Sequence, residues 1–329
     1  MPADPTGDAM MKLEAGVEAS SGQSTAPPPD AKERAFAVAL YGCTSISITF
    51  FNKALFAVYE FNCPSLMTTI QILFSLTFLH VLGGSGVIEM PRFSRGTARK
   101  ILPMAGLWWL YVVAGVVALR YVSVPIFGTL RRSTTLCVMA GEYLLLNTVP
   151  ATEVIGAIVL MVGGAVIAGS TDMAFSLPGY TAVAICVVST AGYLLLLKVN
   201  ADRKLSAWPT LYYNNLLSLP LMLTWLVFFT DDLAVAAKYP YLYNPKFQLL
   251  LVAACSQAFL LNYAIFRCTQ VNSPLATSVT GQCKDVVTLL LGLVLFQSTT
   301  PSSTNLFGLF VSLSGGLAYG WIKARKYLK

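Results

Sequence analysis

Charged residues are scarce in this sequence of 329 residues, and only one histidine is present. Asp, Glu, Lys and Arg together make up 11% of the chain, whereas a soluble globular domain carries about 25%. A chain with so little charge cannot cover a water-soluble core, so most of its surface must face lipid. The net charge of +7 does not indicate a nucleic-acid partner, because such a partner needs basic residues clustered on a soluble face.

Patterns of metal-binding and catalytic residues are also missing. The seven cysteines form no Cys-x-x-Cys pair, so neither a zinc site nor a disulfide framework is indicated. The single histidine, His80, lies near the end of an apolar run and is interpreted as a structural residue. No phosphate-binding glycine loop or nucleophile–histidine pair is found. The sequence therefore predicts no cofactor, no metal and no catalytic residue.

Residues 1–33 contain no long apolar run. They are rich in Ala, Pro, Ser, Gly and Asp and cannot bury enough apolar surface to become ordered. They also lack the apolar core of a cleavable signal peptide. We therefore predict a disordered cytosolic tail, and we expect the first membrane span to act as the insertion signal.

Long apolar runs dominate the remaining sequence, which is reflected in a hydrophobic content of 56%. About 20 apolar residues cross the roughly 30 Å hydrocarbon core of a bilayer as a helix. Ten such runs predict an all-α polytopic membrane protein with ten transmembrane helices. The predicted spans are 35–58, 64–86, 101–119, 125–147, 152–170, 178–199, 209–229, 247–267, 274–296 and 303–323.

The distribution of basic residues supports this number of spans. With a cytosolic N-terminus, 15 of the 22 Lys and Arg residues fall on the cytosolic side and four on the other. Cytosolic loops of membrane proteins carry an excess of these residues. The asymmetry therefore predicts ten spans with both termini in the cytosol.

The two halves of the sequence resemble each other. The fourth and ninth spans both begin at a proline, Pro125 and Pro274. The span that follows each of them contains a Gly-Gly pair, at 163–164 and at 315–316, which we interpret as a site of close helix packing. These matches occur in the same order and at similar offsets, which indicates an internal repeat.

Each repeat contains five spans, an odd number, so the second copy enters the membrane inverted. Residues 34–170 are predicted to form the first five-helix repeat and residues 178–325 the second, followed by a short cytosolic tail at 326–329. Inverted repeats are typical of secondary transporters, which hold the substrate near the membrane midplane between the repeats. The organisation favours a transporter.

Three basic residues lie inside predicted spans: Arg131, Arg132 and Lys284. Each costs about 2.5–3.5 kcal/mol at the bilayer centre. Only Glu142 and Asp285 accompany them, so an anionic ligand would supply the missing negative charge. Arginine suits bidentate contacts to phosphate. The two arginines are adjacent and point about 100° apart on a helix, which leaves open which of them faces the ligand.

The seventh span opens with a polar motif, Tyr213-Asn214-Asn215. Asparagine offers a donor and an acceptor together, as the edge of a nucleobase requires, and tyrosine supplies a ring for stacking. The alternative is that these residues form hydrogen bonds between helices or an aromatic belt at the membrane interface.

Over roughly residues 35–325 the chain resembles the nucleotide-sugar transporters, which are the solute carrier 35 type of the drug/metabolite transporter superfamily. The segments that carry the resemblance are FNK at 51–53, LRYVSVP at 119–125, LRR at 130–132, YNNLLSLP at 213–220 and GQCKD at 281–285. The resemblance implies exchange of a cytosolic nucleotide sugar for a lumenal nucleoside monophosphate across the Golgi or endoplasmic reticulum membrane.

The resemblance also implies roles for particular residues. GDP-mannose transporters carry an FYNN motif that recognises the base and a GALNK motif near the phosphates and sugar. YYNN matches the first motif, whereas GQCKD retains only Gly281 and Lys284 of the second, which weighs against GDP-mannose. The Leu-Arg-Arg segment followed by Cys-Val-Met-Ala-Gly-Glu resembles UDP-sugar members, so a UDP-sugar is favoured.

The expected function is alternating-access antiport in the Golgi membrane, with the endoplasmic reticulum and a homodimer left open. The expected ligand-binding residues are Lys53, Arg131, Arg132, Tyr213, Asn214, Asn215, Gly281 and Lys284. Lys53 ends the first span, where its side chain either contacts ligand or extends to the membrane interface. A GDP-mannose transporter and an exchanger of sugar phosphates are the alternatives within the fold; a membrane enzyme and a scaffold are the alternatives outside it.

Overall fold

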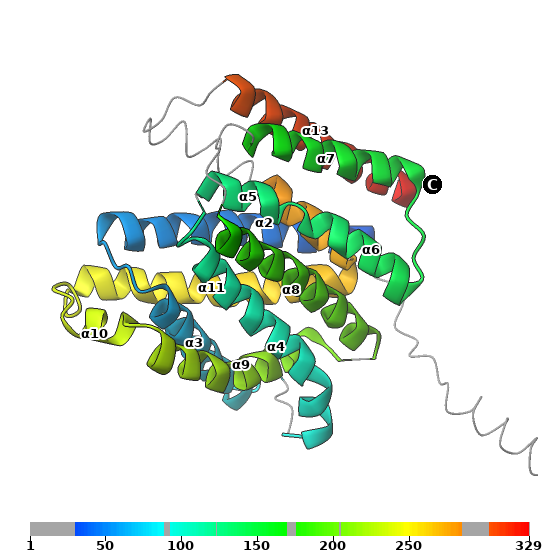
Figure 1. Ribbon diagram of the computed structural model, residues 1–329. Coiled ribbons are helices and arrows are strands. Elements are labelled where there is room, and N and C mark those ends of the chain that lie inside the picture. The colour runs from blue at the N-terminus through cyan, green and yellow to red at the C-terminus, as the bar shows by residue number, and fades with distance from the viewer. Residues whose placement is uncertain are drawn as a thin grey trace, which may run out of the picture. The chain divides into compact units, whose positions relative to one another are not determined.

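A computed structural model describes residues 30–88, 93–122, 124–169, 176–203, 205–284 and 303–328. Every regular element within these ranges is a helix (Figure 1), as composition predicted. The described residues from Ala31 onward pack together as one unit. The first described helix begins at Ala31, inside the stretch that was predicted as a tail, and residues 1–29 of that tail lie outside the described part of the chain.

The helices are, in chain order, α2 (Ala31–Lys53), η1 (Ala54–Val58), α3 (Pro64–Gly84), α4 (Arg95–Ala118), α5 (Val124–Arg131), α6 (Thr134–Leu146), α7 (Thr152–Gly169), α8 (Leu177–Asp202), α9 (Ala207–Phe229), α10 (Asp232–Ala237), α11 (Pro245–Val271) and α13 (Ser303–Leu328). Residues 274–284 are also helical. Within the described ranges, six helices are long and apolar enough to cross a membrane, namely α2 with its extension, α3, α4, α8, α9 and α11. Each of the six coincides with a predicted span.

The other four predicted spans differ in their local structure. The run 125–147 is divided into two helices, α5 and α6. The runs 152–170 and 303–323 correspond to α7, with 18 residues, and to α13, with 26. The run 274–296 is described only as far as residue 284, so its remainder lies outside the described residues.

Two helix starts, those of α3 and α4, are capped by side chains that accept hydrogen bonds from backbone N–H groups. Helix α4 begins at Arg95, earlier than the predicted start at 101, because the side chain of Ser94 accepts a hydrogen bond from the Thr97 N–H. Helix α3 begins at Pro64, and the carboxylate of Asp232 accepts hydrogen bonds from the N–H groups of Ser65 and Leu66, at 2.8 and 3.0 Å. Asp232 therefore joins α10 to α3.

The break in the fourth span lies at the two arginines. Helix α5 ends at Arg131, and α6 starts at Thr134 after a turn through Arg132 and Ser133. Transporters commonly interrupt a helix where it lines the substrate site, because the freed backbone groups and helix ends can then face the ligand. The break between α5 and α6 therefore marks a candidate position for the substrate site.

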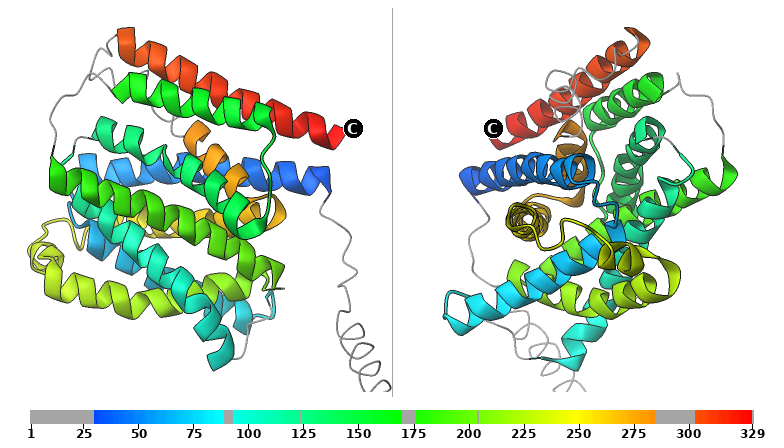
Figure 2. Two further views of the ribbon diagram at one scale, coloured as in Figure 1. Left: turned by 45° about the vertical axis from the view of Figure 1, so that its right-hand side comes forward. Right: turned by 90° about the vertical axis from the view of Figure 1, so that its left-hand side faces the viewer.

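Helices α7 and α13 lie side by side along most of their length (Figure 2). A methyl group on Gly315 of α13 would lie 2.5 Å from the backbone nitrogen of Met161 and 2.7 Å from the carbonyl oxygen of Ala157, both on α7. A methyl group on Gly164 would similarly lie 2.7 Å from the carbonyl oxygen of Gly308. The interpretation of the Gly-Gly pairs as close-packing sites is confirmed at these two glycines.

The other helices pack around several apolar clusters, the largest of which also includes residues of α7 and α13. Helix α2 packs against α11, α4 against α8 and α9, and α3 against α9. Met104, Tyr193 and Phe266 are among the buried residues where these helices meet. Residues 274–284 extend toward α6 and join the two halves, because the carboxylate of Glu142 accepts a hydrogen bond of 2.7 Å from the N–H of Leu275.

Candidate functional site

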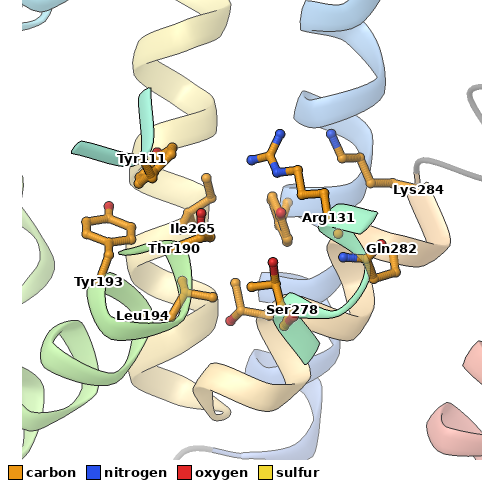
Figure 3. Close-up of a pocket in the computed structure, with 13 residues that line it drawn as sticks. Tyr111, Arg131, Thr190, Tyr193, Leu194, Ile265, Ser278, Gln282 and Lys284 are labelled. Atoms are coloured by element: carbon orange, nitrogen blue, oxygen red, sulfur yellow. The ribbon is translucent and has the colours of Figure 1, made fainter. Parts of the chain in front are cut away.

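A cavity of about 120 Å³ lies between the two halves of the sequence (Figure 3). Hydroxyl groups dominate its lining, together with two positive charges and, among the described residues, no carboxylate. The lining residues are Tyr41, Tyr111, Arg131, Thr134, Thr190, Tyr193, Leu194, Ile265, Thr277, Ser278, Gly281, Gln282 and Lys284. The cavity can therefore bind an anion that also carries hydrogen-bonding groups.

Arg131 and Lys284 lie on the same side of the cavity (Figure 3). Arg131 is the last residue of α5, and its guanidinium carbon lies 5.8 Å from the ring centre of Phe127, one turn earlier. Lys284 ends the described helix 274–284. The two cations thus come from the fourth and the ninth predicted spans.

Arg132 points elsewhere. It is buried, and its guanidinium donates a hydrogen bond of 2.6 Å to the hydroxyl of Ser312 on α13. Ser312 lies where α13 approaches Gly164 most closely. Arg132 therefore connects the break in the fourth span to the α7–α13 pair, and it is not among the residues that line the cavity.

We expect Arg132→Ala to destabilise the protein more than it weakens ligand binding. Loss of a buried hydrogen bond to a charged donor costs about 1.5–3 kcal/mol. Thermal unfolding of Arg132→Ala, Ser312→Ala and the double variant should give strongly non-additive losses, since both residues belong to one contact. A fully additive result, or a large rise in the half-saturating substrate concentration without loss of stability, would contradict this role.

Gly281 lies where the helix 274–284 approaches α2. A methyl group there would be 2.8 Å from the hydroxyl oxygen of Tyr41, another lining residue. One turn earlier on the same helix, the hydroxyls of Ser278 and Thr135 share a hydrogen bond of 3.0 Å. Contacts with α2 and α6 hold this segment beside the cavity, which Gly281, Gln282 and Lys284 line.

The Tyr-Asn-Asn motif is buried in α9 and is not part of the described cavity lining. The hydroxyl of Tyr213 accepts a hydrogen bond of 2.7 Å from the Ser94 N–H at the start of α4. Asn214 and Asn215 are 1% and 2% exposed, and the side-chain oxygen of the first and nitrogen of the second have no hydrogen-bond partner among the described residues. The structure thus does not bring this motif to Arg131 and Lys284.

Lys53 is the last residue of α2, and its side chain lies outside the part of the chain that the structure describes. Sequence reasoning did not single out the lining residues Tyr41, Tyr111, Thr190 and Tyr193. Each lies within a largely apolar helix and belongs to none of the motifs that the sequence presented. Only their convergence in space identifies them.

Comparison with known proteins bears on these observations. The model of the triose-phosphate transporter family matches residues 34–320, which include every residue that lines the cavity. The chain belongs to this family. The members of this family are transporters and not enzymes. We therefore interpret the cavity as the binding site of a transporter.

Several relatives match over most of their length. The UDP-N-acetylglucosamine transporter UGNT1 of Arabidopsis thaliana is 30% identical over 305 residues, which cover 89% of this chain and 88% of that protein. UDP-galactose/UDP-glucose transporter 7 of the same plant is 31% identical, over 87% of this chain and 88% of its own. A GDP-mannose transporter of Meyerozyma guilliermondii is 27% identical, over 87% and 84%.

A solved crystal structure shares the fold. It superimposes with a TM-score of 0.66 over 88% of this chain and 98% of the other chain, at 15% sequence identity. Identity this low supports similarity of fold alone. The helical membrane architecture and the resemblance to nucleotide-sugar transporters, both expected from the sequence, are confirmed by the family match and by these relatives.

Proposed function

We propose that this protein is a nucleotide-sugar antiporter that exchanges a cytosolic UDP-sugar for a lumenal nucleoside monophosphate. One observation carries the proposal: a hydroxyl-lined cavity holds one cation from each half of the chain, Arg131 and Lys284, and no described carboxylate. Two positive charges at one wall suit a diphosphate or a monophosphate. The relatives named as UDP-sugar transporters support the same substrate class.

Within this proposal, Arg131 and Lys284 bind the phosphates. Thr134 stands at the start of α6, immediately after the break, and its buried hydroxyl has no hydrogen-bond partner among the described residues. The positive end of that helix dipole and this hydroxyl both favour an anion at the cavity. Gly281 keeps the helix that carries Lys284 close to Tyr41.

Tyr213, Asn214 and Asn215 remain our proposed base-recognition residues. The amide oxygen of Asn214 and the amide nitrogen of Asn215 have no partner among the described residues, which is unusual because buried polar atoms are nearly always paired. Their burial in α9, away from the cavity lining, means that contact with a base requires helices to move, as alternating access demands. Lys53 retains its proposed role as a binding or gating residue.

We further propose ten spans in two inverted repeats, 34–170 and 178–325, with both termini cytosolic and a Golgi location. The corresponding positions of Arg131 and Lys284 and the reciprocal packing of Gly164 and Gly315 support the repeat. Fluorescence protease protection of tags on the two termini in Golgi-marked cells would test the topology, and a tag protected inside the lumen would contradict it.

The function can be tested in proteoliposomes. Vesicles preloaded with UMP should take up labelled UDP-sugar at a rate well above that of empty vesicles, because antiport requires a counter-substrate. GMP preloading with GDP-mannose outside provides the comparison. Exchange with the guanine pair alone would replace UDP-sugar by GDP-mannose, and absence of exchange with either pair would refute a nucleotide-sugar function.

The size of the cavity favours a second candidate, an exchanger of sugar phosphates and inorganic phosphate. The volume of about 120 Å³ is below the 300–1,000 Å³ of pockets for drug-sized ligands. A sugar phosphate fits such a space more readily than a whole nucleotide sugar, and the matching family is the triose-phosphate transporter family. Inhibition of exchange by inorganic phosphate but not by nucleotides would select this candidate.

A further inference from the structure

The cavity has two chemically different walls (Figure 3). Arg131 and Lys284 lie on one side, and Tyr111 of α4 and Tyr193 of α8 lie on the opposite side. Thr190, one turn before Tyr193, adds a third hydroxyl to the uncharged side; it donates a hydrogen bond of 2.7 Å to the carbonyl oxygen of Cys186 and can still accept one. A tyrosine hydroxyl can both donate and accept a hydrogen bond. The second wall therefore suits a neutral group rich in hydroxyls, placed a short distance from a phosphate.

The hydroxyl of Tyr193 is the most informative group on this wall. The residue is 2% exposed, and its ring is held between those of Tyr111 and Phe266, with ring centres 5.6 and 6.2 Å away. Among the described residues, its hydroxyl has no hydrogen-bond partner. Buried polar atoms are nearly always paired. A molecule bound in the cavity could supply the hydrogen-bond partner of the Tyr193 hydroxyl.

The group next to the phosphates in a nucleotide sugar is a sugar on either side: the ribose of the nucleoside or the transported sugar itself. A space of about 120 Å³ is smaller than the pockets of drug-sized ligands, so only part of a nucleotide sugar can lie in it, and its two cations favour the part next to the phosphates. The ring of Tyr193 packs against its aromatic neighbours. Its hydroxyl therefore has a fixed position and can form a hydrogen bond with a sugar hydroxyl at one particular place.

We propose that Tyr193 is a specificity-determining residue that hydrogen-bonds the transported sugar, opposite the phosphate-binding pair Arg131 and Lys284. The inference rests on the proposed nucleotide-sugar exchange. In this proposal, the wall formed by Tyr111 and Tyr193 binds the transported sugar. The counter-substrate, a nucleoside monophosphate, lacks that sugar. Loss of the Tyr193 hydroxyl should therefore affect the two exchanged ligands unequally.

The test is Tyr193→Phe, which removes one oxygen atom and leaves the ring packing intact. In proteoliposomes, the half-saturating concentration of UDP-sugar should rise about 10-fold, the effect of one lost hydrogen bond to a ligand. The half-saturating concentration of UMP in UMP–UMP exchange should change less than about twofold, because UMP makes no contact with this wall. Tyr263→Phe is the matched control, since Tyr263 stacks on Trp208 with ring centres 4.2 Å apart and is outside the described cavity lining.

The possible results are distinct. An equal rise for UDP-sugar and UMP would place the ribose at Tyr193 or show a structural role, and either would overturn the proposal. Unchanged values for both ligands would overturn it as well, since the hydroxyl would then meet only water. If the wild-type protein exchanges neither UMP nor UDP-sugar, the nucleotide-sugar function itself fails, and that result is obtained before any variant is compared.

Discussion

Lys284→Ala and Arg131→Ala should each lower the exchange of UDP-sugar for UMP by about 100-fold at low substrate concentration. Each side chain lines the cavity and offers a positive charge to the phosphates. Removing one partner of a buried, hydrogen-bonded charge pair costs about 2–5 kcal/mol, and 1.4 kcal/mol corresponds to a factor of ten. Because both exchanged ligands carry phosphate, UMP–UMP exchange should fall together with UDP-sugar uptake.

Counterflow into proteoliposomes measures both rates. Lys246→Ala is the matched control, because it removes one positive charge from an exposed position at the start of α11, away from the cavity. Lys284→Arg should recover part of the activity, since it restores the charge with a different geometry. A thermal-unfolding measurement should first show that the Lys284→Ala protein is folded. Undiminished exchange by that folded variant would then show that Lys284 does not bind the phosphates.

Gly315→Ala should lower the free energy of unfolding by about 3 kcal/mol, the upper part of the range for overpacked interiors. The added methyl group would meet backbone atoms of Met161 and Ala157, which cannot rotate away as a side chain can. Helices α7 and α13 would have to separate, which would also displace Ser312 from Arg132. Thermal unfolding in detergent, followed by size-exclusion chromatography, measures the loss.

A glycine on the same helix provides the comparison. Gly320 of α13 has open space where a methyl group would be added, and alanine favours a helix over glycine by about 0.8–1.0 kcal/mol. Gly320→Ala should therefore unfold at the same temperature as the wild type or slightly above it. Equal destabilisation by the two substitutions would show that the close approach of α7 and α13 is not what requires Gly315.

Sequence reasoning located the long helices well, because membrane spanning imposes length and apolarity directly on the chain. The runs 64–86 and 209–229 correspond to α3, Pro64–Gly84, and to α9, Ala207–Phe229. The interruption within 125–147 was not predicted. The run as a whole is apolar enough for a continuous span despite its two arginines, and the hydrophobic pattern does not specify a turn at Arg132 and Ser133.

The candidate site, too, was predicted only in part from the sequence. The sequence by itself determined that Arg131, Arg132 and Lys284 lie within apolar segments, since a charge in such a segment is evident from its neighbours. Only the tertiary structure decided that Arg131 faces the cavity while Arg132 binds Ser312. The turn between α5 and α6 sets those two directions, and the packing of α13 supplies the partner. Tyr193 enters the site for the same physical reason, because convergence of helices distant in sequence is a property of packing and not of local pattern.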